Sequence, residues 1–300
     1  MSLGNQMLSF AHHYLESTCS SNAEDLVRRY ADALLLAAGA YSFPVDLRLV
    51  QRRFELVSPY TIAGIGQRGF TTPDLRIILN ADDPATIRKF TLAHEFMEIF
   101  FMALRDGAAD EWMPDAMFTE MMKDRRKEQL CDVGAAELAM PMEHFIHAMP
   151  EPVTLPWAQE LAQKGQLSLT ATLWRLLETG LVDAVLIVWR HALKPKETKA
   201  RDSGQLSIFE GVEEMEPIKK LRVERVIAPP NFDKHVPLHK SVPLGSTITR
   251  AFLEQCYVSG RESLDLVGIK GEFWVESQPF RAAGQPLTIS LVHLRDGTPE

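Results

Sequence analysis

The sequence contains few cysteines, no long apolar run and no excess of positive charge. Its three cysteines in 300 residues are Cys19, Cys131 and Cys256. This odd number lacks the paired spacing of a disulfide framework or of a cysteine-rich zinc site. We therefore predict a protein of a reducing compartment whose chemistry, if any, depends on other side chains.

The longest apolar run, ALLLAAGA from Ala33, is too short to cross a bilayer. The N-terminus lacks a basic stretch followed by an apolar core, so we expect no signal peptide, no membrane association and a cytoplasmic location. The net charge of −8 argues against a chain that binds polyanions over its whole surface. The hydrophobic fraction of 46% is typical of a globular protein, and the length suggests two or three domains.

Helical and strand patterns alternate in the first half of the chain. We expect helices over 22–40, from Pro44 towards Phe54, from Asp82 to Arg105, and over 123–139. Between Phe54 and Asn80, glycines and a proline separate short strands. Two short helices around Gly165, the second capped by Ser168, are typical of a helix-turn-helix, and an apolar strand LVDAVLIVW follows them.

The composition changes after Lys194. Residues 194–218 are charged and poor in apolar side chains, which predicts a flexible linker. We expect an α+β protein with four parts: a domain over 1–150 with a small sheet and packed helices, a helix-turn-helix-like segment over 151–193, the linker, and a separate β-rich domain over 219–300. In the last part we expect strands, including the segments around 236–247, and one helix over 247–256.

The stretch TLAHEFMEIF, Thr91 to Phe100, differs at one position from the zinc-protease pattern H-E-x-x-H. On a helix, His94 and Glu98 lie one turn apart and could offer two ligands to one ion. Glu95 would lie beside them as a general base, and Glu128 is the best candidate for the third ligand that a catalytic site needs. By itself, the stretch favours an amphipathic helix that carries a polar stripe and needs no metal.

Several further segments resemble the ImmA/IrrE family of bacterial metallopeptidases. These segments are Pro44-Val-Asp, the strand RIILN followed by Asp82 and Asp83, the run from Arg88 to Glu95, the block E-x-L-C-D-V-G-A-A-E-L-A-M-P from Glu128 to Pro141, and LSLTATLWRLLETGLV. The resemblance spans about 25–189. It implies a zincin-like fold with His94 as first metal ligand, Glu95 as catalytic base and Glu128 as third ligand. It also implies a zinc ion and a peptide substrate extended along the strand 75–79.

Glu98 departs from the family pattern because it replaces the second histidine. It could still ligate, and two carboxylates with one imidazole would also suit Mn²⁺ or Fe²⁺. Alternatively, it pairs with a cation such as Arg88 or Arg105 and leaves the metal weak or absent. A replacement imidazole from His144 or His147 is disfavoured by their position beyond Pro141. We interpret Cys131, three residues after Glu128, as a buried structural thiol.

Two functions follow as hypotheses. The first is a site-specific metallo-endopeptidase that cleaves a helix-turn-helix repressor, the substrate that the resemblance implies, and so induces a stress or mobile-element response. The second is a non-catalytic regulator that binds a repressor or a replication or repair protein. The near balance of charge over 157–194 gives no reason to expect direct DNA binding.

Two features point to partners or signals beyond the peptidase-like region. Gln205-Leu-Ser-Ile-Phe209 resembles the short peptide by which bacterial replication and repair proteins bind the sliding clamp, with Leu206 and Phe209 as apolar anchors. By the same family resemblance, the C-terminal domain could be a GAF-like sensor.

Overall fold

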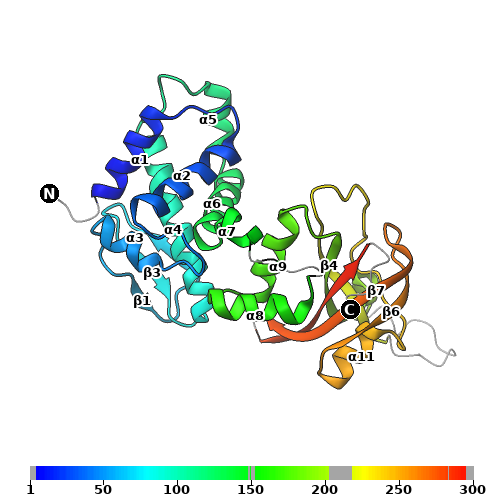
Figure 1. Cartoon of the computed structure of the whole chain (residues 1–300). Coiled ribbons are helices and arrows are strands. Elements are labelled where there is room, and N and C mark those ends of the chain that lie inside the picture. The colour runs from blue at the N-terminus through cyan, green and yellow to red at the C-terminus, as the bar shows by residue number, and fades with distance from the viewer. Residues whose placement is uncertain (1–4, 148, 150–152, 203–217, 283, 295–300) are drawn as a thin grey trace. The chain divides into compact units, whose positions relative to one another are not determined.

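The computed structural model describes residues 5–147, 149, 153–202, 218–282 and 284–294. The chain divides into two compact units (Figure 1). One contains Met1–Met149 and Glu160–Thr172, and the other contains Pro150–Gln159 and Leu173–Glu300. No helix of the described residues is long and apolar enough to span a membrane.

The first unit is mainly helical. Its helices are α1 (Asn5–Ser17), α2 (Ala23–Ala37), α3 (Leu47–Arg53), α4 (Ala85–Arg105), α5 (Asp115–Met121), α6 (Asp124–Ala139) and α7 (Met142–His147). The side chain of Asn22 caps α2 by accepting from the backbone amides of Glu24 and Asp25, as its residue type predicts. The sequence predicted α2, α3, α4 and α6, but it gave no indication of α1, α5 or α7.

Helix α4 runs through the core of this unit. Its apolar side chains Phe96, Phe100 and Leu104 are almost fully buried, and the Phe100 ring lies 4.7 Å from that of Tyr30 in α2. Helices α1 and α6 also pack against α4. Because α4 is held from several directions, the polar side chains on its remaining face have fixed positions.

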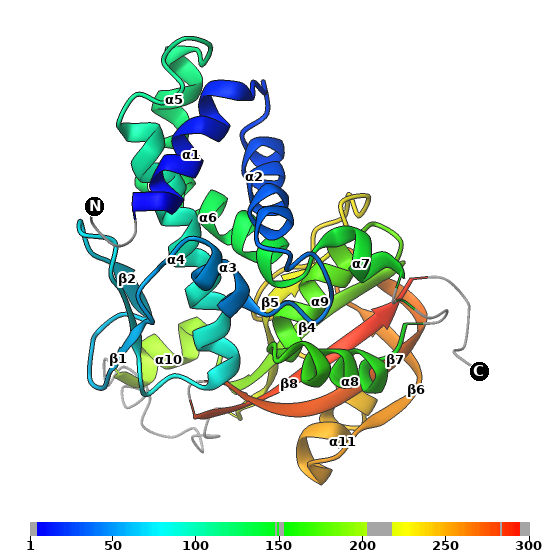
Figure 2. The same ribbon diagram turned by 60° about the vertical axis from the view of Figure 1, so that its left-hand side comes forward.

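A small sheet lies next to α4. Strand β3 (Ile77–Asn80) is central, with β1 (Tyr60–Ile62) parallel on one side and β2 (Gly69–Thr71) antiparallel on the other. The prediction that 75–79 forms the substrate-binding edge is therefore wrong, because both edges of β3 already hold partner strands. Gly69 lets β2 approach α4 (Figure 2), since a Cβ there would lie only 2.7 Å from Thr91 Cγ2.

Two helices are present where a helix-turn-helix was predicted. They are α8 (Leu155–Gly165) and α9 (Leu169–Glu178), and the hydroxyl oxygen of Ser168 accepts from the amide of Ala171 at 3.2 Å. The division between the two units falls within these helices.

The second unit is built on a five-stranded antiparallel sheet with the order β5-β4-β8-β7-β6. Its strands are β4 (Ala184–Ala192), β5 (Lys220–Ile227), β6 (Val258–Asp265), β7 (Lys270–Ala282) and β8 (Gln285–His293). Helix α11 (Thr247–Glu254) contacts β6, β7 and β8. The predicted mixed fold with a separate C-terminal sheet is confirmed, although this sheet also takes in β4, which precedes the predicted linker.

Other details of the second half differ from expectation. Helix α10 (Pro195–Asp202) occupies the beginning of the segment 194–218. Residues 236–247 form no named strand, and among the described residues they contribute one isolated bridge, between Ser241 and Arg222. The clamp-like peptide Gln205–Phe209 lies outside the described residues.

A buried carboxylate connects parts of the second unit. Glu276 of β7 is fully buried, and its two oxygens accept from the Leu155 amide at 2.9 Å, the Tyr257 hydroxyl at 2.8 Å and a ring nitrogen of His293 at 2.8 Å. A buried carboxylate that is hydrogen-bonded this fully is a structural feature. It attaches the start of α8 to the sheet.

Candidate metal centre

The polar face of α4 carries the predicted site residues. His94 and Glu98 are one turn apart and partly buried, and Glu95 beside them is only 4% exposed. The helical spacing therefore brings an imidazole and two carboxylates to one region of the helix surface.

Helix α6 approaches this face closely (Figure 1) because Gly134 has no side chain. A Cβ at Gly134 would lie 2.4 Å from Cε of Met97, a fully buried residue of α4. Two pairs of α6 side chains, each spaced by one turn, then reach α4. Glu128 and Asp132 contact His94, whereas Lys127 and Cys131 contact Glu98.

The imidazole of His94 is held between carboxylates. Its Nδ1 lies 3.0 Å from Asp132 Oδ1, and its Nε2 lies 3.4 Å from Glu128 Oε2 and 4.0 Å from Glu98 Oε1. Burial acts to lower the pKa of His94, but the hydrogen bond with Asp132 and the surrounding carboxylates outweigh it and raise this pKa above its ordinary value.

This donor arrangement fits a divalent ion. Asp132 can only accept, so Nδ1 carries a proton and Nε2 is the nitrogen that faces Glu98 and Glu128. A neutral imidazole would present a lone pair to two carboxylates, which is unfavourable unless a proton or a cation lies between them. The donor atoms of a tetrahedral zinc ion lie about 3.3 Å apart, which matches the 3.4 Å between His94 and Glu128 and is shorter than the 4.0 Å between His94 and Glu98. His94, Glu98 and Glu128 are thus a possible ligand set.

Cys131 offers a further donor near the same ion position. Its sulfur, His94 and Glu98 have ligand atoms within 4.8 Å of one another. However, the thiol is fully buried, as predicted, and burial raises its pKa strongly. It also does not line the cavity described below, whereas Glu128 does. We therefore regard Glu128 as the better third ligand.

The cation next to Glu98 is Lys127. Its ammonium donates to Glu98 Oε2 at 2.8 Å, while the Cys131 thiol lies 3.5 Å from Oε1. The expected partners Arg88 and Arg105 were wrong, and Arg88 instead donates to the carbonyls of Ala81 and Asp83. Burial alone would lower the pKa of Lys127, but the hydrogen bond to Glu98 raises it.

Glu95 is oriented from the small sheet. The Thr71 hydroxyl of β2 donates to its Oε2 at 2.8 Å. Burial raises the pKa of Glu95, and the Thr71 hydrogen bond and His94 only partly oppose this effect. A carboxylate with a raised pKa is suited to accept and return a proton.

These side chains surround a single cavity of about 480 Å³. The residues that line it are Gln67, Arg68, Gly69, Phe70, Thr71, Phe90, Thr91, His94, Glu95, Glu98, Lys127, Glu128 and Asp132. Strand β2, α4 and α6 each contribute, so the candidate ligands and the candidate base face the same space.

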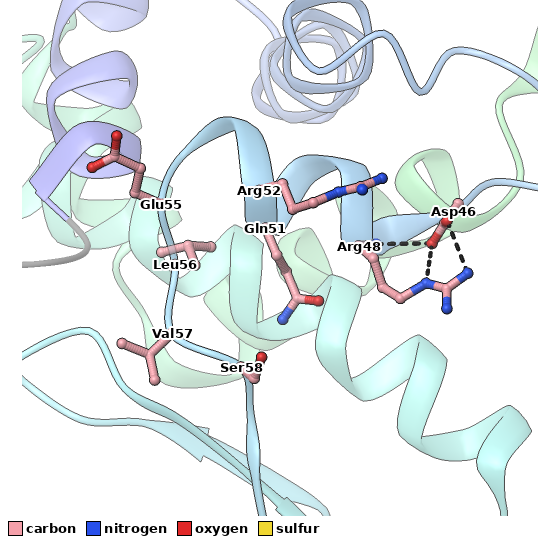
Figure 3. Close-up of a pocket in the computed structure, with 8 residues that line it drawn as sticks. All are labelled: Asp46, Arg48, Gln51, Arg52, Glu55, Leu56, Val57 and Ser58. Atoms are coloured by element: carbon pink, nitrogen blue, oxygen red, sulfur yellow. Dashed lines mark hydrogen bonds and ion pairs between the residues drawn. The ribbon is translucent and has the colours of Figure 1, made fainter.

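A second cavity, of about 630 Å³, lies beside α3 (Figure 3) and is lined by Asp46, Arg48, Gln51, Arg52, Glu55, Leu56, Val57 and Ser58. Its Asp46 carboxylate accepts from the Arg48 guanidinium at 2.9 and 3.0 Å and caps α3. The Arg48 hydrogen bond lowers the pKa of Asp46. This carboxylate therefore has a structural role, and no histidine or cysteine lines the cavity. We do not regard this cavity as a metal site.

The sequence predicted some residues of the site and missed others. The structure brings together His94, Glu95, Glu98 and Glu128. It places His144 beside the Tyr41 carbonyl and His147 beside the Glu143 carbonyl, each within hydrogen-bonding distance. Asp132 was not predicted, although its spacing of one turn from Glu128 parallels that of His94 and Glu98. Thr71 and Lys127 had no recognisable sequence signal.

Residues 57–177 match the Peptidase_M78 family model, described as the IrrE N-terminal-like domain. This segment is therefore similar to an IrrE N-terminal-like domain. The family recognised from the sequence is thereby confirmed, and the matched segment contains every residue of the candidate metal centre. Peptidase_M78 is a metal-dependent family, which supports a metallopeptidase-like or regulatory role for the chain.

The fold is similar to that of a solved structure, a Mycobacterium tuberculosis transcriptional regulator. The two share 10% sequence identity with a TM-score of 0.52, over 95% of this chain and 80% of that chain. At this identity the similarity shows the fold alone. The search of curated proteins found no match.

Proposed function

We propose that the protein is a metal-dependent, site-specific endopeptidase whose substrate is a helix-turn-helix repressor. The observation that carries this proposal is the convergence of His94, Glu98 and Glu128 with the buried Glu95 in one cavity. The family match supports peptide-bond hydrolysis as the chemistry. Cleavage of the repressor would induce a stress or mobile-element response.

His94, Glu98 and Glu128 would hold the ion. When bound, a divalent ion polarises a substrate carbonyl and makes water more acidic. Zinc is the ion that the family resemblance implies, whereas two carboxylates and one imidazole also suit Mn²⁺ or Fe²⁺. Asp132 holds the His94 ring by its other nitrogen, which fixes the direction of Nε2.

Glu95 would act as the general base. Its carboxylate takes a proton from the attacking water and then returns it to the leaving amine. The Thr71 hydroxyl holds Oε2, so Oε1 is the oxygen available to accept the proton. The buried environment of Glu95 raises its affinity for this proton.

The substrate backbone would bind along β2 rather than β3. β2 is an edge strand of its sheet, and Gly69, Phe70 and Thr71 line the cavity. An extended peptide that pairs with an edge strand receives main-chain hydrogen bonds independent of its sequence. Pairing with β2 would bring its backbone to the cavity that contains Glu95.

The test combines metal analysis with a cleavage assay. We expect protein purified without chelator to contain, or to take up, close to one equivalent of a transition metal. It should cut a helix-turn-helix repressor encoded beside its gene, and Glu95→Gln should abolish cleavage while metal is still bound. A protein that cannot be loaded with metal, or a Glu95→Gln variant that cuts at the wild-type rate, would refute the proposal.

The second candidate is a non-catalytic regulator, and the ion pair between Lys127 and Glu98 favours it. In this case Glu98 remains paired with Lys127, no ion is held, and the same surface binds a repressor without cutting it. The clamp-like residues Gln205, Leu206 and Phe209 would add binding to a replication protein. Stable binding of the intact repressor by a protein that takes up no metal would support this candidate.

A further inference from the structure

Lys127 is an unusual neighbour for a metal ligand. Its side chain is 24% exposed, it lines the cavity, and its ammonium donates to the carboxylate that replaces the second histidine of the family pattern. A cation in this position repels a divalent ion, so its presence requires an explanation.

The charges of the ligand set explain why a cation lies beside Glu98. His94 as a neutral imidazole, with ionised Glu98 and Glu128, presents a charge of −2 to the ion. The ammonium of Lys127 reduces this charge to −1, which is the charge of two imidazoles and one carboxylate. The Lys127–Glu98 pair as a whole therefore has the charge of the imidazole that it replaces.

The pairing also limits how Glu98 can bind. Oε2 accepts from Lys127, whereas Oε1 faces His94 Nε2 at 4.0 Å. Oε1, whose other contact is the weak donor Cys131 Sγ at 3.5 Å, is therefore the one oxygen not held by a cation, and it parallels the single donor nitrogen of an imidazole. Without Lys127, Glu98 could bind through both oxygens, which suits larger oxygen-preferring ions such as Mn²⁺.

The neighbouring arginines of α6 do not share this position. Arg126 pairs with Glu24 at 3.1 Å, and Arg125 is exposed and does not line the cavity. Lys127 is the residue of this basic run that points to the site.

We propose that Lys127 is a specificity-determining residue that offsets the charge of Glu98, confines it to one ligating oxygen, and so limits the affinity of the site for oxygen-preferring divalent ions. This inference rests on the proposed metal site.

The experiment measures the dissociation constants of Zn²⁺ and Mn²⁺ by competition with a chromophoric chelator, using the full chain. We expect Lys127→Met to bind Mn²⁺ at least about tenfold more tightly, with a smaller gain for Zn²⁺. Arg125→Met removes the same charge from the same helix and should change neither constant by more than about twofold. Lys127→Gln serves as a second variant if Lys127→Met does not fold.

The Glu98→Gln background tests whether Lys127 acts through Glu98. There the gain from Lys127→Met should be much smaller, because the carboxylate that Lys127 restrains is gone. An equal gain in that background would overturn the inference. So would wild-type affinities in both Lys127 variants, with the metal site left intact. Failure of every protein to bind either ion would instead refute the proposed function itself.

Discussion

His94 Nδ1 lies 3.0 Å from Asp132 Oδ1, and this contact determines what the other ring nitrogen can do. With Nδ1 donating to a carboxylate, Nε2 faces Glu98 and Glu128. Helix α4 thus supplies the imidazole, and Asp132 of α6 orients it.

Replacing Asp132 with alanine should weaken Zn²⁺ binding. Loss of a carboxylate that orients a metal-binding histidine typically costs about 10–100-fold in affinity. Chelator competition measures the change, and Gln129→Ala, an exposed position of the same helix, should leave the affinity unaltered. Equal affinities in the two variants would show that Asp132 does not orient the ligand.

Restoring the second histidine alone should fail to strengthen the site. In Glu98→His, the imidazole would stand beside the Lys127 ammonium, which lies 2.8 Å from the present carboxylate. We expect Glu98→His to bind Zn²⁺ no more tightly than wild type. The double variant Glu98→His/Lys127→Met should bind it at least about tenfold more tightly than the single variant. Tight binding by the single variant would contradict this expectation.

Gly134→Ala should destabilise the first unit. The new Cβ would fall 2.4 Å from Met97 Cε in a fully buried contact, and overpacking of this kind costs about 1–3 kcal/mol. The urea midpoint at constant m-value reports the loss. Gly66→Ala is the control, because a Cβ there meets nothing within 4 Å, and a wild-type midpoint for Gly134→Ala would show that the helices separate at little cost.

High pH should destabilise the protein through its tyrosines. Burial raises the pKa of Tyr14, Tyr41 and Tyr257 to about 12, and it also raises that of Tyr30. Unfolded tyrosines ionise near pH 10. The neutral phenol is thus favoured in the fold, and its stabilising contribution is complete below about pH 10 and is lost as the pH rises towards 12.

Ultraviolet phenolate absorbance tests this expectation. Four of the five tyrosines should remain un-ionised at about pH 11 in the native protein, whereas all five should ionise together near pH 10 in denaturant. Ionisation of all five near pH 10 in protein that is still folded would contradict the raised pKa values of these four tyrosines.

The sequence predicted those parts of the site that depend on helical spacing. His94 and Glu98 share a face because they are one turn apart, and Glu128 followed from its position in the family block. The cation beside Glu98 could not be chosen from the sequence. Arg88, Arg105 and Lys127 were all available, and only the approach of α6 at Gly134 selects Lys127.

The pairing of strands in the sheets could likewise not be predicted from the sequence. The apolar run around Val185 predicted a buried strand, but an uninterrupted apolar pattern specifies neither partners nor register. β4 could therefore not be assigned to the C-terminal sheet in advance. The central position of β3 could also not be predicted, because the composition of short, similar strands does not specify their order within a sheet.

The position of β4 has a consequence for dividing the chain. β4 lies between β5 and β8, which follow it by many residues. A fragment that ends at residue 202 would carry a strand with both edges unpaired, and a fragment that begins at residue 218 would lack a central strand. Each of the two fragments should fold poorly alone, yet the two should associate into one sheet when they are expressed together. Cleavage of the backbone between residues 202 and 218 would therefore leave the five-stranded sheet together, because β4 would stay paired with β5 and β8.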